Sequence, residues 1–265
     1  VPMSALRRFR GLPMARRSAV LALAAIRCAH AASDAMPRTV LITGGAKGIG
    51  AATAERFAAD GNRVIIHYRS DASEAEALRQ TLAPCSTAEH VCLHAALDKP
   101  GASEALIKQA MEVCDGKLDV LVCNHGIYEE FPVESTSSAE WADSFERILR
   151  TNLAAPAELA FAFAQAARAR GGGASIVFTS SRGAYRGEPL AAAYGASKAG
   201  INSLTGSLAQ AFAPYGVRVA AVAPGFVATK MAAAVLASSR GDAIRQQSPF
   251  DRVAEPEDVA AAIYY

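Results

Sequence analysis

At 265 residues, with 51% hydrophobic and 20% charged residues, the chain has the composition of a folded globular protein and not of a disordered or fibrous one. The formal net charge is +2, but six arginines stand against a single acid, Asp34, in the first 36 residues, so the remainder is slightly acidic. That remainder has no basic surface typical of nucleic-acid binding, and no uninterrupted run of eighteen apolar residues predicts a membrane span.

The five cysteines include no Cys-x-x-Cys pair, so neither a disulfide scaffold nor a zinc site is expected, and we predict no bound metal. Cys92 and Cys123 fall in apolar, strand-like runs. We therefore expect buried free thiols at these positions.

Residues 1–35 form an N-terminal extension that is rich in Arg, Ser and Ala and has three interpretations. An organelle transit peptide fits the positive charge, and a non-native leader fits a true start at Met36. A secretory signal fits the apolar run that follows Arg17 and the small residues Ala29 and Ala31. The expected location is the cytoplasm, or a plastid or mitochondrion if the extension is a transit peptide.

From Met36 onward, short β-branched runs alternate with alanine-rich stretches of helical length, the pattern of βαβ units around a parallel sheet. Strands are predicted at 38–43, 63–67, 91–95, 118–123, 174–179 and 216–222. Helices are predicted near 48–60, 73–83, 102–114, 139–168 and 192–213. Residues 36–265 are therefore expected to form one α/β domain of the Rossmann type, with a doubly wound parallel sheet.

A last helix is predicted to begin at Pro256, because proline suits the first helical turn and the surrounding carboxylates suit its positive end. The chain stops soon afterwards, at Tyr265, without a cap or polar tail. We interpret this ending as a C-terminal truncation.

A glycine-rich segment, TGGAKGIG, follows the first strand and opens the first helix. In this context glycines let backbone amides approach a pyrophosphate at the positive end of a helix, so the segment predicts dinucleotide binding. The residues expected to contact the nucleotide here are Thr43, Gly44, Lys47, Gly48, Ile49 and Gly50.

The residues after the second strand indicate which dinucleotide is bound. NAD sites usually carry an acid there for the ribose 2′-hydroxyl, whereas this chain has Tyr68, Arg69 and Ser70 and no acid between Gly61 and Ser70. Together with Lys47, these residues favour a 2′-phosphate, and hence NADP(H) over NAD(H).

Tyr194 and Lys198 stand four residues apart in a helical stretch, so both project from one face. A lysine ammonium is expected to lower the pKa of a neighbouring tyrosine, which can then exchange a proton with a carbonyl oxygen. Ser181 follows the fifth strand, thirteen residues before Tyr194, and could hold the substrate oxygen; Ser180 is the adjacent alternative.

Taken together, these motifs resemble the short-chain dehydrogenase/reductase family from Met36 to the end, and among its members most resemble the 3-oxoacyl-(acyl-carrier-protein) reductases. The resemblance implies an NADP-dependent oxidoreductase acting on CH-OH or C=O groups, and a homodimer or homotetramer. It also implies a seventh strand, which we expect to be missing at the C-terminus. Catalytic residues implied by the match are Asn152, Ser181, Tyr194 and Lys198.

The same resemblance implies further roles around the cofactor. Asn152 would support a water that links Lys198 to solvent, and Lys198 would also hold the nicotinamide ribose. A mobile substrate loop would span 230–250. The remaining residues expected to line the cofactor cleft are Asn124, Gly126, Tyr194, Pro224, Gly225, Val227 and Thr229.

Two positions depart from the family pattern. Ala96 stands where an adenine-contacting acid is usual, and Asp98 follows two residues late, so adenine binding is expected to be altered. His125 replaces a common Asn or Ala, and we expect it to be packed or solvent-facing and not catalytic.

Two other functions compete with carbonyl reduction: NAD-dependent alcohol oxidation within the same family, and a non-catalytic nucleotide-binding scaffold. A small-molecule carbonyl or alcohol is the expected partner, with no nucleic acid and no membrane. Arg182, Arg186 or Lys230 could meet an anionic substrate or face water.

Overall fold

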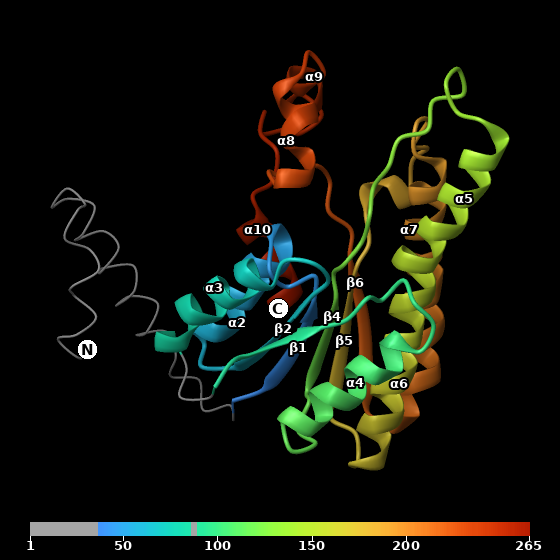
Figure 1. The fold of residues 1–265 in the computed structure, drawn as a ribbon. Helices are drawn as coiled ribbons and strands as arrows, with labels where there is room; N and C mark the ends of the chain where they lie inside the picture. Colours follow the sequence, from blue (N-terminus) through green and yellow to red (C-terminus); the bar gives the residue numbers. More distant parts are fainter. Residues whose placement is uncertain (1–36, 86–88) are drawn as a thin grey trace, which may run out of the picture.

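The structure, a computed structural model, describes residues 37–85 and 89–265. The predictions for the N-terminal extension lie outside these residues. The elements follow one another as alternating strands and helices, as the sequence pattern predicts (Figure 1).

Six parallel strands form one sheet in the order β3-β2-β1-β4-β5-β6. The direction of winding reverses between β1 and β4, which gives the doubly wound topology that the sequence predicts. The strands are β1 (Thr39–Thr43), β2 (Arg63–Tyr68), β3 (Val91–His94), β4 (Val120–Cys123), β5 (Ala174–Thr179) and β6 (Val217–Val222).

Helices cover both faces of the sheet, so the central strands carry apolar residues on both sides (Figure 1). One face packs against α4 (Ala102–Val113), α6 (Ala155–Ala169) and α7 (Ala192–Phe212). The other packs against α2 (Gly48–Ala59), α3 (Ala72–Leu82) and α10 (Pro256–Tyr264).

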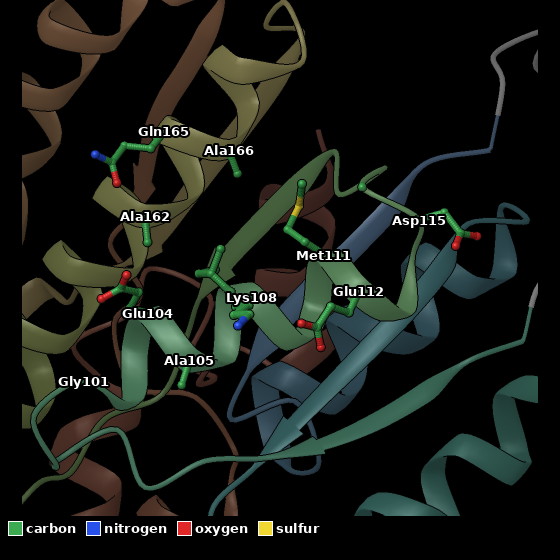
Figure 2. Close-up of a pocket in the computed structure, with 12 residues that line it drawn as sticks. Gly101, Glu104, Ala105, Lys108, Met111, Glu112, Asp115, Ala162, Gln165 and Ala166 are labelled. Atoms are coloured by element: carbon green, nitrogen blue, oxygen red, sulfur yellow. The ribbon is translucent and has the colours of Figure 1, made fainter.

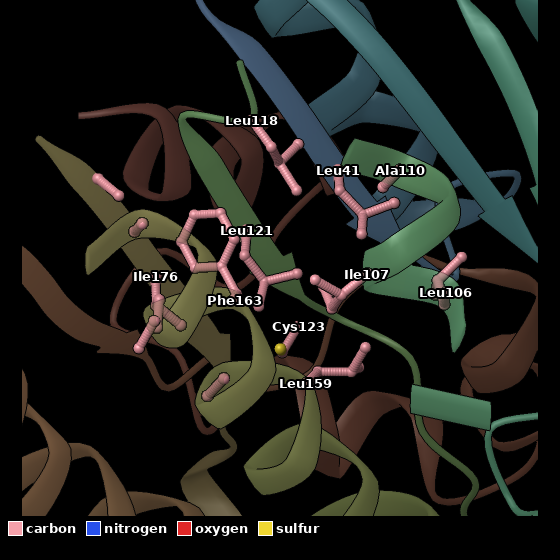
Figure 3. Close-up of a cluster of buried hydrophobic side chains, with 14 of the residues drawn as sticks. Leu41, Leu106, Ile107, Ala110, Leu118, Leu121, Cys123, Leu159, Phe163 and Ile176 are labelled. Carbon is pink, nitrogen blue, oxygen red and sulfur yellow. The ribbon is translucent and has the colours of Figure 1, made fainter. Parts of the chain in front are cut away.

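The core on the α4, α6 and α7 face is built from large side chains that interdigitate between sheet and helices (Figure 3). Phe163 of α6 and Leu121 of β4 are both fully buried in it. The free thiols of Cys114 and Cys123 also belong to this core, in agreement with the prediction for Cys123.

The helix predicted at 139–168 is divided into α5 (Ser138–Leu149), a π-helical turn at Arg150–Ala154, and α6. Thr151 and Asn152 are buried in the wide turn, so the deviation from a regular α-helix is built around inward-facing polar side chains. The predicted substrate loop at 230–250 also contains two short helices, α8 (Lys230–Ala237) and α9 (Gly241–Arg245).

Among the described residues, no helix is long and apolar enough to cross a membrane. Within the same residues, no group of three or more His, Cys, Asp or Glu side chains is placed to hold a metal ion.

Phe163→Ala tests the core. Phe163 is fully buried, so removing its ring should lower the free energy of unfolding by about 3 to 5 kcal/mol. Phe161→Ala on the same helix is the control, because Phe161 is 58% exposed and should change stability by no more than about 0.5 kcal/mol. Urea unfolding of both variants measures the difference, and equal losses would contradict this assignment of the core.

Candidate active site

One cavity of about 940 Å³ lies at the carboxyl ends of the strands, where the sheet reverses its winding. It is lined by the glycine-rich loop after β1, by the segments that follow β2, β4, β5 and β6, and by α8. Sequence-predicted residues on its wall are Gly44, Lys47, Gly48, Ile49, Tyr68, Arg69, Ser70, Asn124, Gly126, Ser181, Tyr194, Lys198, Pro224, Gly225, Val227 and Thr229.

Three other predicted residues lie beside this cavity without lining it. Thr43 is fully buried at the end of β1 and donates from its hydroxyl to the Val122 carbonyl over 3.2 Å. Gly50 packs in the first turn of α2, where a Cβ would come within 2.1 Å of the Gly44 carbonyl oxygen. Asn152 is buried behind Gly126. All three therefore shape the wall from behind.

The glycine-rich loop is held down by His67 of β2, which the sequence reasoning missed. The Gly44 amide donates to His67 Nδ1 over 3.1 Å, and the Gly45 amide donates to the His67 carbonyl over 2.9 Å. His67 Nε2 lies 3.0 Å from the Ala95 carbonyl, so Nε2 carries the proton. Burial lowers the His67 pKa to about 4, which keeps Nδ1 available as an acceptor at neutral pH.

The signal for His67 was present in the sequence. A polar residue stands inside the apolar run of β2 (RVIIHY), and a buried polar side chain needs a hydrogen-bond partner. The apolar strand sequence therefore indicates that the His67 side chain must form hydrogen bonds, although only the fold shows with which groups.

The cations predicted for a 2′-phosphate are already paired with carboxylates. Lys47 Nζ lies 3.1 Å from Asp71 and 2.5 Å from Glu74, and Arg69 lies 3.3 Å from Asp98. These acids come from the start of α3 and from the segment after β3, beyond the stretch from Gly61 to Ser70 that carries no acid. The sequence pattern therefore did not reveal the ion pairs of Lys47 and Arg69.

Asp98 belongs to the cavity although it follows the usual acidic position by two residues. Leu97 and Asp98 line the cavity, and Ala96 is not on its wall. The Asp98 carboxylate binds Arg69 through Oδ2, while its Oδ1 is buried without a hydrogen-bond partner. An unsatisfied carboxylate oxygen on the wall is a candidate acceptor for a ligand donor.

Tyr194 and Lys198 both lie on α7, one helical turn apart, with the Lys198 ammonium 5.7 Å from the centre of the Tyr194 ring. Lys198 is 5% exposed, and its Nζ donates to the carbonyl of Thr179 at the end of β5 over 2.7 Å. Burial lowers the Lys198 pKa to about 8.

The pKa of Tyr194 moves in the direction opposite to the prediction. Burial raises it, a hydrogen bond from Ser181 offsets part of the rise, and the charge of Glu188 adds to it. Lys198 makes no resolved contribution to this pKa, so the lowering expected from it is absent. As a result, the Tyr194 hydroxyl is protonated at neutral pH and able to donate.

The two serines after β5 have separate tasks. Ser180 is buried and donates to Asn202 Oδ1 over 2.6 Å, so its hydroxyl serves packing beneath α7. Ser181 lines the cavity and accepts from the Gly183 amide over 3.0 Å. Both serines border the cavity, but the Ser180 hydroxyl is bonded to Asn202, whereas the Ser181 hydroxyl is hydrogen-bonded to Tyr194.

Asn152 places its side chain on the backbone of Ile127. Its Oδ1 accepts from the Ile127 amide over 2.8 Å and its Nδ2 donates to the Ile127 carbonyl over 2.9 Å. A Cβ on Gly126 would lie 3.2 Å from Asn152 Oδ1 and 3.7 Å from Lys198 Nζ. Gly126 therefore lies against both side chains, and a larger residue would crowd Asn152.

Asn124 and His125 join β4 to the glycine-rich loop. The Asn124 amide group donates to the carbonyls of Thr43 and Gly44, in each case over 3.2 Å. His125 Nδ1 lies 2.8 Å from Thr43 Oγ1, and burial lowers the His125 pKa to about 3. His125 is therefore a neutral, packed side chain, in line with the expectation for it.

The opposite end of the cavity carries side chains that the sequence did not single out. The Tyr128 ring meets the Tyr194 ring edge-on, with 5.1 Å between their centres, and the Tyr128 hydroxyl donates to Glu130 over 3.0 Å. Glu130 also pairs with Arg240, beyond α8, at 3.6 Å. Tyr194 and Arg240 come from distant parts of the chain, so only the fold brings them to Tyr128 and Glu130.

A second hollow lies between α4 and α6, where Glu104, Lys108 and Glu112 of α4 face Gln165 of α6 (Figure 2). It shares no residue with the cavity described above. None of the predicted catalytic or cofactor residues lies in it, so the first cavity is the candidate active site.

Lys198→Met tests the buried ammonium. The Lys198 pKa is about 8 in the folded chain against 10.5 for the ordinary side chain, so between these pH values the unfolded chain binds a proton that the folded chain has lost. The stability of the parent protein relative to the Met variant should therefore rise from pH 8 to pH 10.5 and stay level below pH 8. Urea unfolding of both proteins across this range measures the difference in the free energy of unfolding. If that difference does not change with pH, the shifted pKa is contradicted.

The family model for the short chain dehydrogenases matches residues 38–239. A 3β-hydroxysteroid dehydrogenase of Eggerthella lenta is 35% identical over 238 residues, covering 86% of each chain. Two solved structures are also similar. A Burkholderia cenocepacia short chain dehydrogenase in complex with NADP has a TM-score of 0.74 at 32% identity and covers 85% of this chain and 88% of its own.

The second solved structure is a 3-oxoacyl (acyl-carrier-protein) reductase of Agrobacterium tumefaciens with NADP bound. It has a TM-score of 0.75 at 27% identity and covers 85% of both chains. The cavity, the Rossmann-type sheet and these similarities lead to one conclusion: the chain belongs to the short-chain dehydrogenase family of oxidoreductases.

Proposed function

We propose that the chain reduces a ketone or aldehyde to the corresponding alcohol with NADPH, and that Tyr194 donates the proton. The observation that carries this proposal is that Ser181, Tyr194 and Lys198 line the same cavity as the glycine-rich loop. A candidate proton donor and a glycine-rich loop thus share one cavity at the carboxyl ends of the strands.

The loop residues fit a dinucleotide. Gly44 has φ +61° and Gly48 has φ +50°, and a Cβ on Gly48 would lie 3.1 Å from the Thr229 side chain. The loop therefore approaches the cavity through backbone that only glycine adopts readily, at the N-terminus of α2. When bound there, NADPH would supply a hydride to the carbonyl carbon.

The side chains around Tyr194 suit the complementary proton transfer. The Tyr194 O–H bond breaks as its proton passes to the carbonyl oxygen, and the raised pKa keeps that proton in place until then. Ser181 would hold the same oxygen through a hydrogen bond. Lys198 has three N–H donors and uses one in the hydrogen bond to the Thr179 carbonyl, so its ammonium can also stabilise the Tyr194 phenolate that remains after proton transfer.

Tyr194→Phe removes only the hydroxyl and should lower kcat by a factor of about 10² to 10⁴. NADPH affinity, measured by cofactor fluorescence, should stay within about twofold, since the ring is kept. Tyr185→Phe is the control, because Tyr185 is 75% exposed and outside the cavity wall. The assay follows NADPH absorbance with a panel of ketones, aldehydes, a 3-oxosteroid and a 3-oxoacyl thioester. Turnover by the Phe variant above a tenth of the parent rate would exclude Tyr194 as the proton donor.

NAD-dependent alcohol oxidation is the competing activity, and one observation favours it. Asp71, Glu74 and Asp98 already neutralise Lys47 and Arg69, and carboxylates near the ribose oppose a 2′-phosphate. The proposal for NADPH is supported by the geometry of Arg69, which is 58% exposed at the cavity wall and can turn from one carboxylate to a phosphate.

Arg69→Ala separates the two cofactors. Loss of the guanidinium should raise the KM for NADPH about tenfold and leave the KM for NADH within about twofold. Lys99→Ala is the matched control, because Lys99 also pairs with Asp98, at 3.7 Å, but does not line the cavity. Initial rates with each cofactor measure the effect, and a parent enzyme that uses NADH more efficiently than NADPH would overturn the preference.

A further inference from the structure

Two guanidinium groups converge on one neutral side chain at the substrate end of the cavity. Arg182 Nη1 lies 2.6 Å and Arg186 Nη1 3.3 Å from Oε1 of Gln247, in the segment after α9. Within the described part of the chain, neither arginine forms an ion pair with a carboxylate. Of the two, only Arg182 lines the cavity.

The position of Arg182 is set by three segments of the fold. Its backbone amide donates to the Pro224 carbonyl over 2.8 Å, and its guanidinium lies 5.0 Å from the centre of the Phe226 ring. It follows Ser181 directly in the chain. These contacts place a partly buried cation in the same cavity as Ser181 and Tyr194.

The other candidate cations of this region are occupied. Lys230 Nζ lies 2.8 Å from Glu74, which also binds Lys47, so Lys230 belongs to the nucleotide end of the cavity. Arg240 pairs with Glu130. Of the described lysines and arginines that line the cavity, only Arg182 and Lys198 lack an acidic partner, and Lys198 is the buried ammonium that donates to the Thr179 carbonyl beside Tyr194.

The electrostatic setting of Arg182 favours an incoming anion. Burial and the neighbouring Arg186 both lower the Arg182 pKa, while Glu188 raises it. Glu188 lines the same cavity, yet it makes no ion pair with Arg182 in this part of the structure. A guanidinium in such a site gains most from a carboxylate that it can bind through two parallel hydrogen bonds.

We propose that the substrate carries a carboxylate group and that the Arg182 guanidinium binds it, so that Arg182 determines specificity for oxo acids over neutral carbonyl compounds. This inference rests on the proposed carbonyl reduction. It narrows the substrate class from carbonyl compounds in general to oxo acids.

The experiment compares 4-oxopentanoate with its methyl ester, and 4-oxocyclohexanecarboxylate with its methyl ester, in the parent enzyme and in Arg182→Gln. The parent should prefer each acid over its ester in kcat/KM. In the Gln variant the acid-to-ester ratio of kcat/KM should fall by about ten- to a hundredfold, because KM rises for the acids and changes little for the esters.

Arg186→Gln is the matched control, because it removes the neighbouring guanidinium that contacts the same Gln247 but does not line the cavity. This substitution should change the acid-to-ester ratio of kcat/KM less than about threefold.

Gln247→Ala tests a purely structural role for Arg182. If Arg182 only anchors the segment after α9, both Arg182→Gln and Gln247→Ala will lower acid and ester rates equally, which overturns the proposal. A parent enzyme that prefers the esters also overturns it while leaving carbonyl reduction intact, whereas absence of turnover with every carbonyl compound contradicts the proposed function itself.

Discussion

The parallel alignment of the six strands is the constraint on which the rest of the structure depends. Because every strand points the same way, all of their carboxyl ends lie along one edge of the sheet. The loops at that edge carry the glycine-rich segment after β1, Asn124 after β4 and Ser181 after β5. Residues more than a hundred positions apart in the chain thereby line one cavity.

Several polar groups buried at this edge hydrogen-bond to one another or to nearby backbone, and these bonds shape the site. Lys198 is held by the Thr179 carbonyl, Asn152 by the backbone of Ile127, and the Gly44 amide by His67. A buried polar group without a partner is costly, so each of these bonds restricts the site to one arrangement. The cavity is therefore largely preorganised by the chain's own hydrogen bonds.

The sequence predicted those parts of the molecule that depend on local patterns. The apolar run at 174–179 coincides with β5, and the alternation of strands and helices yields the doubly wound sheet. Contacts between distant segments were not predictable. The carboxylates that pair with Lys47 come from the next helix, and Gln247 meets Arg182 across 65 positions. The pKa of Tyr194 depends on burial, which a spacing of four residues does not reveal.

The π-helical turn at Arg150–Ala154 changes the angular phase of a long helix. Each residue of an α-helix turns the chain by about 100°, so one additional residue in a wide turn rotates everything beyond it by that amount. Asn152 in this turn bonds to the Ile127 backbone, and Phe163 of α6, beyond the turn, lies in the core. Removing one residue from the turn would rotate α6 relative to α5 and displace the contacts of one of them, so the length of this segment is as constrained as its composition.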